Sequence, residues 1–364
     1  MKNTFGTSVT LTVFGESHGA AVGAVVDGLC PGIRVDAERI ARALSRRRPA
    51  EAGESARRES DGFEILSGVF EGFTTGTPLC IVIPNADVQS PAYERGVCRP
   101  SHADRAANVK YHGFEDYRGG GHFSGRLTAP IVAAGEICRA ALEIPGVDLA
   151  THIMTLGDIS DRAFDDVKND IEYLKNADFP ALSADCAERM RRETAEMASK
   201  GDSIGGAAET AVVGLPAGVG EPTFDSIEGC LSHALFAIGG IKGIEFGGGF
   251  AACRGKGSDY NDALRIADGR VYTLTNNDGG INGGISNGMP IVFRCAVKPT
   301  PSIALPQQTV DIISGENKTV GIKGRHDAAI IRRVCPVIDS VTALVMCDLL
   351  AQRYGTDVFV RGIG

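Results

Sequence analysis

Glycine clusters constrain the fold of this chain more than any other feature of its sequence. The 364 residues include 47 glycines, nearly twice the usual share of roughly 7%. They gather without a fixed period, for example at Gly119-Gly120-Gly121 and at Gly247-Gly248-Gly249. Glycine permits tight turns and lets the backbone come very close to a neighbouring group. We therefore expect tight turns, some of them at places where backbone approaches a ligand.

Short apolar runs between turn residues predict strands, and longer amphipathic stretches predict helices. Predicted strands cover 8–14, 20–29, 63–70, 78–83 and 207–215, and further strands alternate with glycine turns up to about residue 297. Predicted helices cover 130–143, 226–238 and Pro336 to about Gln352, with a helical outer segment within 160–202. Asp36 is predicted to cap another helix, which buries Ile40 and Leu44 and ends in the arginine triplet 46–48.

The fold class expected from these elements is α+β. No Gly/Ser or Pro linker divides the chain, so residues 1–364 are expected to form a single domain. Strands, glycine turns and helices recur in both halves, which raises the hypothesis of an internal pseudo-repeat. Residues 95–126 differ from the rest, because they lack a regular apolar pattern and are rich in Gly, Arg, His and Asp. A segment of this kind inside a compact domain is usually functional or disordered.

Charge and cysteine usage restrict the class of protein. The net charge of -8 argues against nonspecific binding of nucleic acid, although the clustered arginines predict local anion binding. Ten scattered cysteines form no CxxC pair, as expected of reduced thiols in the cytoplasm. The N-terminus has no apolar signal core and no run approaches 18 apolar residues, so we expect a soluble, intracellular protein without membrane contact.

Three motifs carry candidate chemistry. FGESHG (14–19) offers a carboxylate, a hydroxyl and an imidazole, while RPSHAD (99–104) and GRHD (324–327) each set an arginine beside a histidine and a carboxylate. Such groups bind a phosphate or carboxylate and move a proton beside it. Each motif alone is equally consistent with a polar turn or a surface salt bridge. Adjacent side chains on extended backbone face opposite sides, so Ser17 and His18 are expected to serve different partners.

Two further stretches fit ligand binding only weakly. RGGGHFSGR (118–126) resembles a phosphate-cradling loop in composition but is neither a Walker A loop nor a GxGxxG fingerprint, and KPTPS (298–302) is also consistent with a solvated turn. No HExxH, CxxC or EF-hand spacing occurs, so no metal site is expected.

Together the motifs resemble those of the chorismate synthase family, in order, from about residue 6 to 350. The motifs that carry the resemblance are FGESHG, RRRP, RRESD, LSGVFEG, TTGTP, RPSHAD, YRGGGxxSxR, GDSIGG, GLPAGVGEPTFD, IKGIEFGGGF, GGINGGISNG, KPTPSI and GRHD. The resemblance implies a β-α-β sandwich and a lyase of the shikimate pathway, which converts 5-enolpyruvylshikimate-3-phosphate to chorismate and phosphate by a 1,4-elimination. It also implies a requirement for reduced FMN without net redox change, and a homotetramer.

The resemblance also implies residue roles. His18 corresponds to the acid that protonates the leaving phosphate, His102 to the histidine beside the anionic face of reduced flavin, and Asp327 to the carboxylate near flavin N5. Ser17 would relay a proton and face the flavin, while His18 would face the substrate phosphate. Substrate-binding candidates are Arg47, Arg48, Arg126, Arg325 and Arg333. Cofactor-binding candidates are His122, Phe123, Ser124, Gly239, Gly240, Gly283, Lys298, Pro299, Thr300, Pro301, Ser302 and Arg325, and Arg47 would contact NADP if it is used.

The chain departs from the family pattern at two flavin positions. His122-Phe123-Ser124 stands where Arg-Ser-Ser is common, and Gly239-Gly240 stands where Asn-Ala is common. Without an extra domain for reducing its own flavin, the chain is expected to depend on an external flavin reductase, with NADPH only an indirect reductant. Two alternatives stay open: an FMN-dependent oxidoreductase with net electron transfer, and a non-catalytic phosphate- or nucleotide-binding protein. Glu16 is expected to brace its loop by accepting backbone amides.

Overall fold

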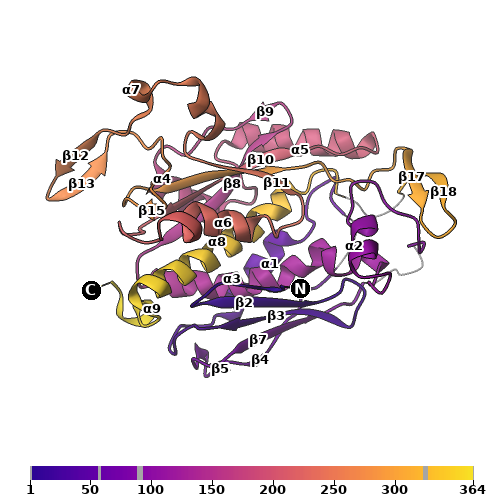
Figure 1. The fold of residues 1–364 in the computed structure, drawn as a ribbon, viewed down its shortest axis with the longest axis horizontal. Coiled ribbons are helices and arrows are strands. Elements are labelled where there is room, and N and C mark those ends of the chain that lie inside the picture. The colour runs from indigo at the N-terminus through magenta and orange to yellow at the C-terminus, as the bar shows by residue number, and fades with distance from the viewer. Residues whose placement is uncertain (1, 56–58, 88–92, 323–326, 364) are drawn as a thin grey trace.

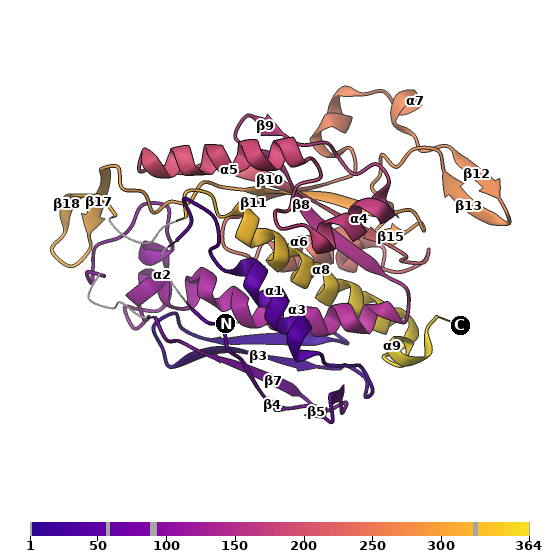
Figure 2. The same cartoon turned by 180° about the vertical axis from the view of Figure 1, so that it is seen from behind.

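The molecule is built in layers of sheet and helix. The structure is a computed structural model that describes residues 2–55, 59–87, 93–322 and 327–363. Within these ranges, two antiparallel sheets of five strands each enclose a layer of helices (Figure 1). The reverse view shows the same order, with α1 (Ala37–Arg47), α3 (Thr128–Glu143) and α8 (Ile331–Tyr354) between the sheets (Figure 2). The expected α+β class is confirmed.

The first sheet comes from the N-terminal quarter of the chain and has the order β1-β2-β3-β7-β4. Its strands are β1 (Thr4–Phe5), β2 (Thr10–Gly15), β3 (Ala21–Asp27), β7 (Leu79–Pro84) and β4 (Glu64–Ser67). Alternate residues such as Ile81 and Ile83 are completely buried, because one face of the sheet covers the helix layer. The predicted strand at 63–70 is interrupted at Gly68, and β5 (Val69–Phe70) pairs instead with β6 (Phe73–Thr74).

The second sheet has the order β11-β16-β10-β8-β9 and carries helices on its outer face (Figures 1 and 2). Its strands are β11 (Ile241–Phe246), β16 (Ile291–Val297), β10 (Gly206–Val213), β8 (Asp148–Leu156) and β9 (Ile159–Ser160). The outer helices are α4 (Val167–Asn176) and α5 (Ala184–Ser199), so the prediction of an outer helical segment in 160–202 is confirmed.

Helix α8 forms the centre of the core. It starts at Ile331, five residues before the predicted start at Pro336, so the proline lies inside the helix. The helix is long and apolar enough to cross a membrane by length and composition, which the sequence interpretation overlooked. However, its apolar window is entirely buried in the protein, as in a core helix.

The remaining elements are short. They comprise α2 (Asp104–Lys110), α6 (Ile227–Leu235), α7 (Gly257–Tyr260), α9 (Val358–Arg361) and the hairpins β12 (Leu264–Ala267) with β13 (Arg270–Thr273), β14 (Ile281–Asn282) with β15 (Ile285–Ser286), and β17 (Gln307–Asp311) with β18 (Glu316–Val320). The hairpins β12–β13 and β17–β18 extend from opposite ends of the molecule (Figures 1 and 2). Residues 95–126 contain α2 and two 3₁₀ segments (118–123 and 125–127) but no strand.

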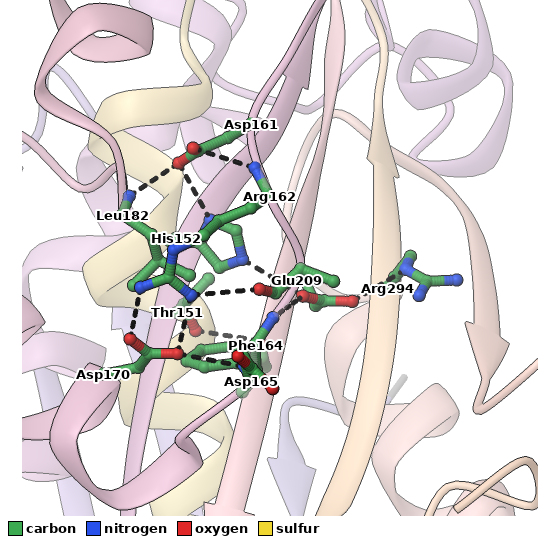
Figure 3. Close-up of polar contacts among 12 residues, drawn as sticks. Thr151, His152, Asp161, Arg162, Phe164, Asp165, Asp170, Leu182, Glu209 and Arg294 are labelled. Atoms are coloured by element: carbon green, nitrogen blue, oxygen red, sulfur yellow. Dashed lines mark hydrogen bonds and ion pairs between the residues drawn. The ribbon is translucent and has the colours of Figure 1, made fainter.

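A buried polar cluster joins α4 to the second sheet (Figure 3). The imidazole of His152 in β8 is completely buried between two carboxylates, with Nε2 3.1 Å from Glu209 Oε2 and Nδ1 3.6 Å from Asp161 Oδ2. Arg294 of β16 extends the cluster by donating from Nε to Glu209 Oε1 at 2.9 Å. Sequence reasoning did not anticipate these contacts, because the partners come from separate strands.

Candidate active site

A cavity of about 880 Å³ lies where the helix layer meets the end of β2. It collects predicted site residues that are up to 315 positions apart in the sequence, from His18 to Arg333. The lining includes His18, Arg47, Arg48, His122, Phe123, Ser124, Arg126, Gly239, Ser302, Asp327 and Arg333. Arg325 lies outside the described residues. One cavity therefore joins candidates for substrate binding, cofactor binding and proton transfer.

The FGESHG segment is a tight turn that follows β2. Gly19 N–H donates to the Glu16 carbonyl at 3.1 Å, which places Ser17 and His18 at the two corners. A Cβ added at Gly119 would lie 2.5 Å from His18 Nε2 and 2.9 Å from Ser17 Oγ, so both side chains approach the same point. The prediction that they face opposite sides is wrong, because it assumed extended backbone.

Glu16 braces this turn through its main chain. Its carbonyl accepts from Gly19 N–H and from the Asn85 side-chain amide, the latter at 2.9 Å. Glu16 accepts a hydrogen bond from a backbone N–H, as expected, and it does so with its main-chain carbonyl oxygen. Asn85 also donates to the Gly19 carbonyl at 2.9 Å, which ties the turn to the end of β7.

The RPSHAD and KPTPS segments meet beside the cavity. His102 Nε2 and Ser302 Oγ form a hydrogen bond of 2.7 Å, and Lys298 Nζ donates to the Ser101 carbonyl at 2.8 Å. Ser302 lines the cavity, whereas His102 reaches it through Ser302. Within RPSHAD, Arg99 is engaged by Asp104 through paired contacts of 2.8 Å. Part of the Arg99 guanidinium therefore stabilises the RPSHAD turn itself.

The arginines at the cavity are held by a buried carboxylate that the sequence interpretation did not single out. Asp61 Oδ2 accepts from Arg47 Nη2 at 2.9 Å, and Asp61 Oδ1 forms an ion pair with Arg126 Nη1. Burial, followed by the nearby charges of Arg333 and Arg126, lowers the pKa of Arg47 to about 10, although Asp61 opposes this shift. Arg47 is the last residue of α1 and is buried. The sequence predicted its position at the end of the helix but not its burial.

Asp327 is fixed by contacts from two other segments. Ser55 N–H donates to its Oδ1 at 2.9 Å, and Arg333 Nη1 forms an ion pair with its Oδ2. Arg333 also donates from Nε to the Arg47 carbonyl at 2.8 Å. Arg333 therefore connects the candidate proton-transfer carboxylate to the arginine triplet, a role beyond the predicted contact with substrate.

The glycine-rich loop contributes one wall. His122 Nδ1 is 2.9 Å from the Gly15 carbonyl, which fixes the loop against the FGESHG turn. The Phe123 ring is 49% exposed and meets Tyr111 edge to face, with ring centroids 6.1 Å apart. The loop thus presents an aromatic surface to the cavity.

Some cofactor candidates lie away from the cavity lining. Lys298 N–H donates to the Gly240 carbonyl at 2.9 Å, so these two residues form a support behind Gly239. Gly283 lies at the turn of the β14–β15 hairpin. The residues that do not line the cavity are Gly240, Gly283, Lys298, Pro299, Thr300 and Pro301.

Tyr93 and Asp61 also line the cavity and were not singled out from the sequence. Tyr93 meets His18 edge to face, with ring centroids 5.3 Å apart, and the Arg99 guanidinium lies 5.4 Å from the centre of its ring. The sequence RRESD, in which Asp61 follows two arginines, could have indicated Asp61 as a site residue. No neighbouring residue indicated Tyr93. Among the described residues, no group of three His, Cys, Asp or Glu side chains could hold a metal ion.

Comparison with known proteins connects this geometry to one family. The family model for chorismate synthase matches residues 9–351. The chorismate synthase of Methanocella arvoryzae is 44% identical over 95% of this chain and 93% of its own length, and that of Thermococcus kodakarensis is 43% identical over 98% and 99%. A solved structure titled "Crystal Structure of Chorismate Synthase" has a TM-score of 0.75 at 27% identity, covering 96% of this chain and 94% of the other.

These matches extend over nearly the whole chain and include every described segment that lines the cavity after β1. The resemblance inferred from the motifs is therefore confirmed. The chain belongs to the chorismate synthase family, whose members are lyases of the shikimate pathway.

Proposed function

We propose that this chain converts 5-enolpyruvylshikimate-3-phosphate to chorismate and inorganic phosphate by a 1,4-elimination. The observation that carries the proposal is the convergence of Arg47, Arg126, His18 and Asp327 on one cavity. The substrate has a phosphate and two carboxylates, and buried guanidinium groups bind such anions with directed hydrogen bonds. A cationic cavity inside a protein of net charge -8 supports a specific anionic ligand.

The elimination breaks the carbon–oxygen bond to phosphate and a carbon–hydrogen bond at C6, and it forms a carbon–carbon double bond. In this proposal His18 protonates the leaving phosphate, and Asp327 takes part in proton transfer on the C6 side. Ser17 approaches the same point as His18, so we assign it a relay between these groups. His102 acts through its hydrogen bond with Ser302.

The lining of the cavity supports a flavin beside the substrate in this proposal. Apolar side chains of Leu11, Ile131 and Val337 line it beside the arginines, which suits a flat ring system with a charged tail. When bound, reduced FMN supplies transient electron transfer without net redox change. His122, Phe123, Ser124, Gly239 and Ser302 are the candidates that would contact it, and Arg325 remains a candidate outside the described residues.

Other parts of the proposal rest on the sequence and on the family. We assign a cytoplasmic homotetramer, a single domain over 1–364, and reduced FMN supplied by an external reductase. If NADP binds at all, Arg47 is the residue proposed to contact it. The two five-stranded antiparallel sheets support an internal pseudo-repeat, which remains a hypothesis.

An anaerobic assay tests the function directly. Purified protein is mixed with 5-enolpyruvylshikimate-3-phosphate and FMN reduced by dithionite, and chorismate and phosphate are followed. We expect both products in equal amounts with catalytic flavin. Flavin oxidised in proportion to product would favour an oxidoreductase, and folded protein that binds flavin without forming either product would favour a binding protein.

Variants and a change of reductant complete the test. His18→Ala and His102→Ala should each abolish turnover in the lyase and only perturb binding in a non-catalytic protein. Replacing dithionite by NADPH should give no turnover unless a flavin reductase is added.

A further inference from the structure

We propose that Asp61 is a positioning residue for the elimination, which holds Arg47 and Arg126 so that their remaining donors meet the anionic groups of the ligand. The inference rests on the proposed function of the cavity. It concerns a residue that does not itself need to touch the substrate. The supporting observation is that the Asp61 carboxylate bridges the guanidinium groups of Arg47 and Arg126, which come from different parts of the chain.

The bridge is almost completely buried. The Asp61 side chain is 0% exposed, and those of Arg47 and Arg126 are 7% and 2% exposed. Each carboxylate oxygen serves one arginine: Oδ2 accepts from Arg47 Nη2 at 2.9 Å, and Oδ1 pairs with Arg126 Nη1. The carboxylate therefore links the end of α1 to the segment just before α3.

Arg126 is oriented by all three of its nitrogen atoms. Besides the contact with Asp61, Nε donates to Asn85 Oδ1 at 2.9 Å and Nη2 donates to the Pro84 carbonyl at 3.0 Å. A guanidinium has five N–H groups, so donors remain for a ligand. The plane of Arg126 is thus fixed before any ligand binds.

Arg47 is anchored at one edge and unsatisfied at another. Its Nη2 binds Asp61, whereas its buried Nε has no hydrogen-bond partner among the described residues. Arg47 also lines the cavity. A buried donor without a partner is costly, and an anion at this position would satisfy it. Asp61 thus leaves part of Arg47 available for the ligand.

The backbone at Asp61 supports a positional requirement. Its φ is +52°, a left-handed conformation that is uncommon for residues other than glycine, although aspartate adopts it more readily than most. Such strain persists where surrounding contacts determine the conformation, and it is common at functional sites. At Asp61 this conformation coincides with the two ion pairs to Arg47 and Arg126.

Loss of the negative charge should disturb both arginines at once. Without it, two buried guanidiniums would face each other, with Arg333 also nearby. We expect Asp61→Asn to raise KM for 5-enolpyruvylshikimate-3-phosphate at least about tenfold, with a smaller change in kcat, because removing one member of a buried charge pair weakens binding strongly. Asp61→Glu keeps the charge and should give an intermediate KM.

Asp170→Asn is the matched control. Asp170 is also a buried aspartate in a paired contact with an arginine, Arg162, but it lies on α4, outside the second sheet. The control should lose stability and keep KM. An Asp61→Asn protein with the KM of the unmodified chain would overturn the proposal, and so would an equal rise in KM in the control. If Asp61→Asn does not fold, Asp61→Glu decides: a raised KM supports the proposal and an unchanged KM overturns it.

A binding measurement separates this proposal from the proposed function. The dissociation constant of inorganic phosphate is measured by calorimetry for the unmodified chain, the Asp61 variants and the control. Weaker phosphate binding in the Asp61 variants alone supports the positioning role even if the unmodified chain shows no turnover. Equal phosphate binding in all proteins contradicts it, whatever the turnover.

Discussion

Gly119 shows how closely the backbone approaches His18 and Ser17, the groups proposed to transfer protons. Its φ is +61°, and an added Cβ would come within 3 Å of both the His18 ring and Ser17 Oγ. We expect Gly119→Ala to lower kcat by about two orders of magnitude, because small displacements of catalytic groups have effects of that size. Steady-state kinetics under anaerobic conditions measures the change.

Gly269 serves as a control that distinguishes displacement of His18 and Ser17 from backbone strain at the substituted glycine. Gly269 in the β12–β13 hairpin has φ +72° with no atom within 4 Å of an added Cβ. Gly269→Ala should therefore cost only the strain of the left-handed conformation, about 1 kcal/mol, and leave kcat unchanged. Equal kcat values for the two variants would show that the approach of Gly119 to Ser17 and His18 has no part in turnover.

At the scale of elements, the sequence predicted the features that depend on neighbouring residues, such as the start of a helix. Helix α1 begins after Asp36, whose side chain accepts from the N–H groups of Glu38 and Arg39, as its sequence predicted. The side of the turn that Ser17 occupies and the burial of Arg47 were beyond prediction. Both depend on segments distant in sequence, namely the glycine-rich loop and the carboxylate of Asp61.

Element α8 also fastens the N-terminal segment before β2. Asp348 Oδ1 accepts from Ser8 N–H at 2.6 Å, from Val9 N–H at 2.9 Å and from Thr7 N–H at 3.1 Å. We expect Asp348→Ala to lower the free energy of unfolding by at least about 2 kcal/mol, because buried amides lose their acceptor. Urea denaturation measures this loss.

Asp185→Asn provides the comparison for Asp348. Its side chain is 80% exposed and faces Arg189 one helical turn away, an arrangement that contributes about 0.5 kcal/mol or less. A loss in Asp348→Ala no larger than in Asp185→Asn would mean that the attachment of residues 7–9 to α8 contributes nothing to stability.

At the scale of the whole molecule, the site and the core share α8. Its first turn carries Arg332, which donates to the Arg46 and Arg48 carbonyls, and Arg333, which donates to the Arg47 carbonyl. The same helix continues through the core between the two sheets (Figure 1). The carbonyl oxygens at the end of α1 are thus satisfied by the helix that carries the core, which fixes the arginine triplet relative to both sheets.

The buried cluster around His152 makes the stability of the molecule depend on pH (Figure 3). Burial alone would lower the pKa of His152, but hydrogen bonds and charges from Asp161 and Glu209 outweigh burial and raise it above its usual value. Because the pKa of His152 is higher in the folded protein, its protonation stabilises the fold fully when the pH is below the unfolded pKa of about 6.5. This stabilisation is lost as the pH rises through the folded pKa. The same contacts lower the pKa values of Asp161 and Glu209, so their contribution is lost in acid.

We therefore expect His152→Gln to be less stable than the unmodified chain by about 3 kcal/mol at pH 6, because Asp161 and Glu209 lose the buried cation between them and only Glu209 keeps its contact with Arg294. The difference should shrink as pH rises from 6 to 9, since neutral His152 no longer balances them. Guanidinium denaturation at several pH values measures it. Replacing the exposed His112 by Asn, measured at the same pH values, should give only a small difference in stability. A large difference for His152→Gln that is constant from pH 6 to 9 would contradict a charged His152 in the folded protein.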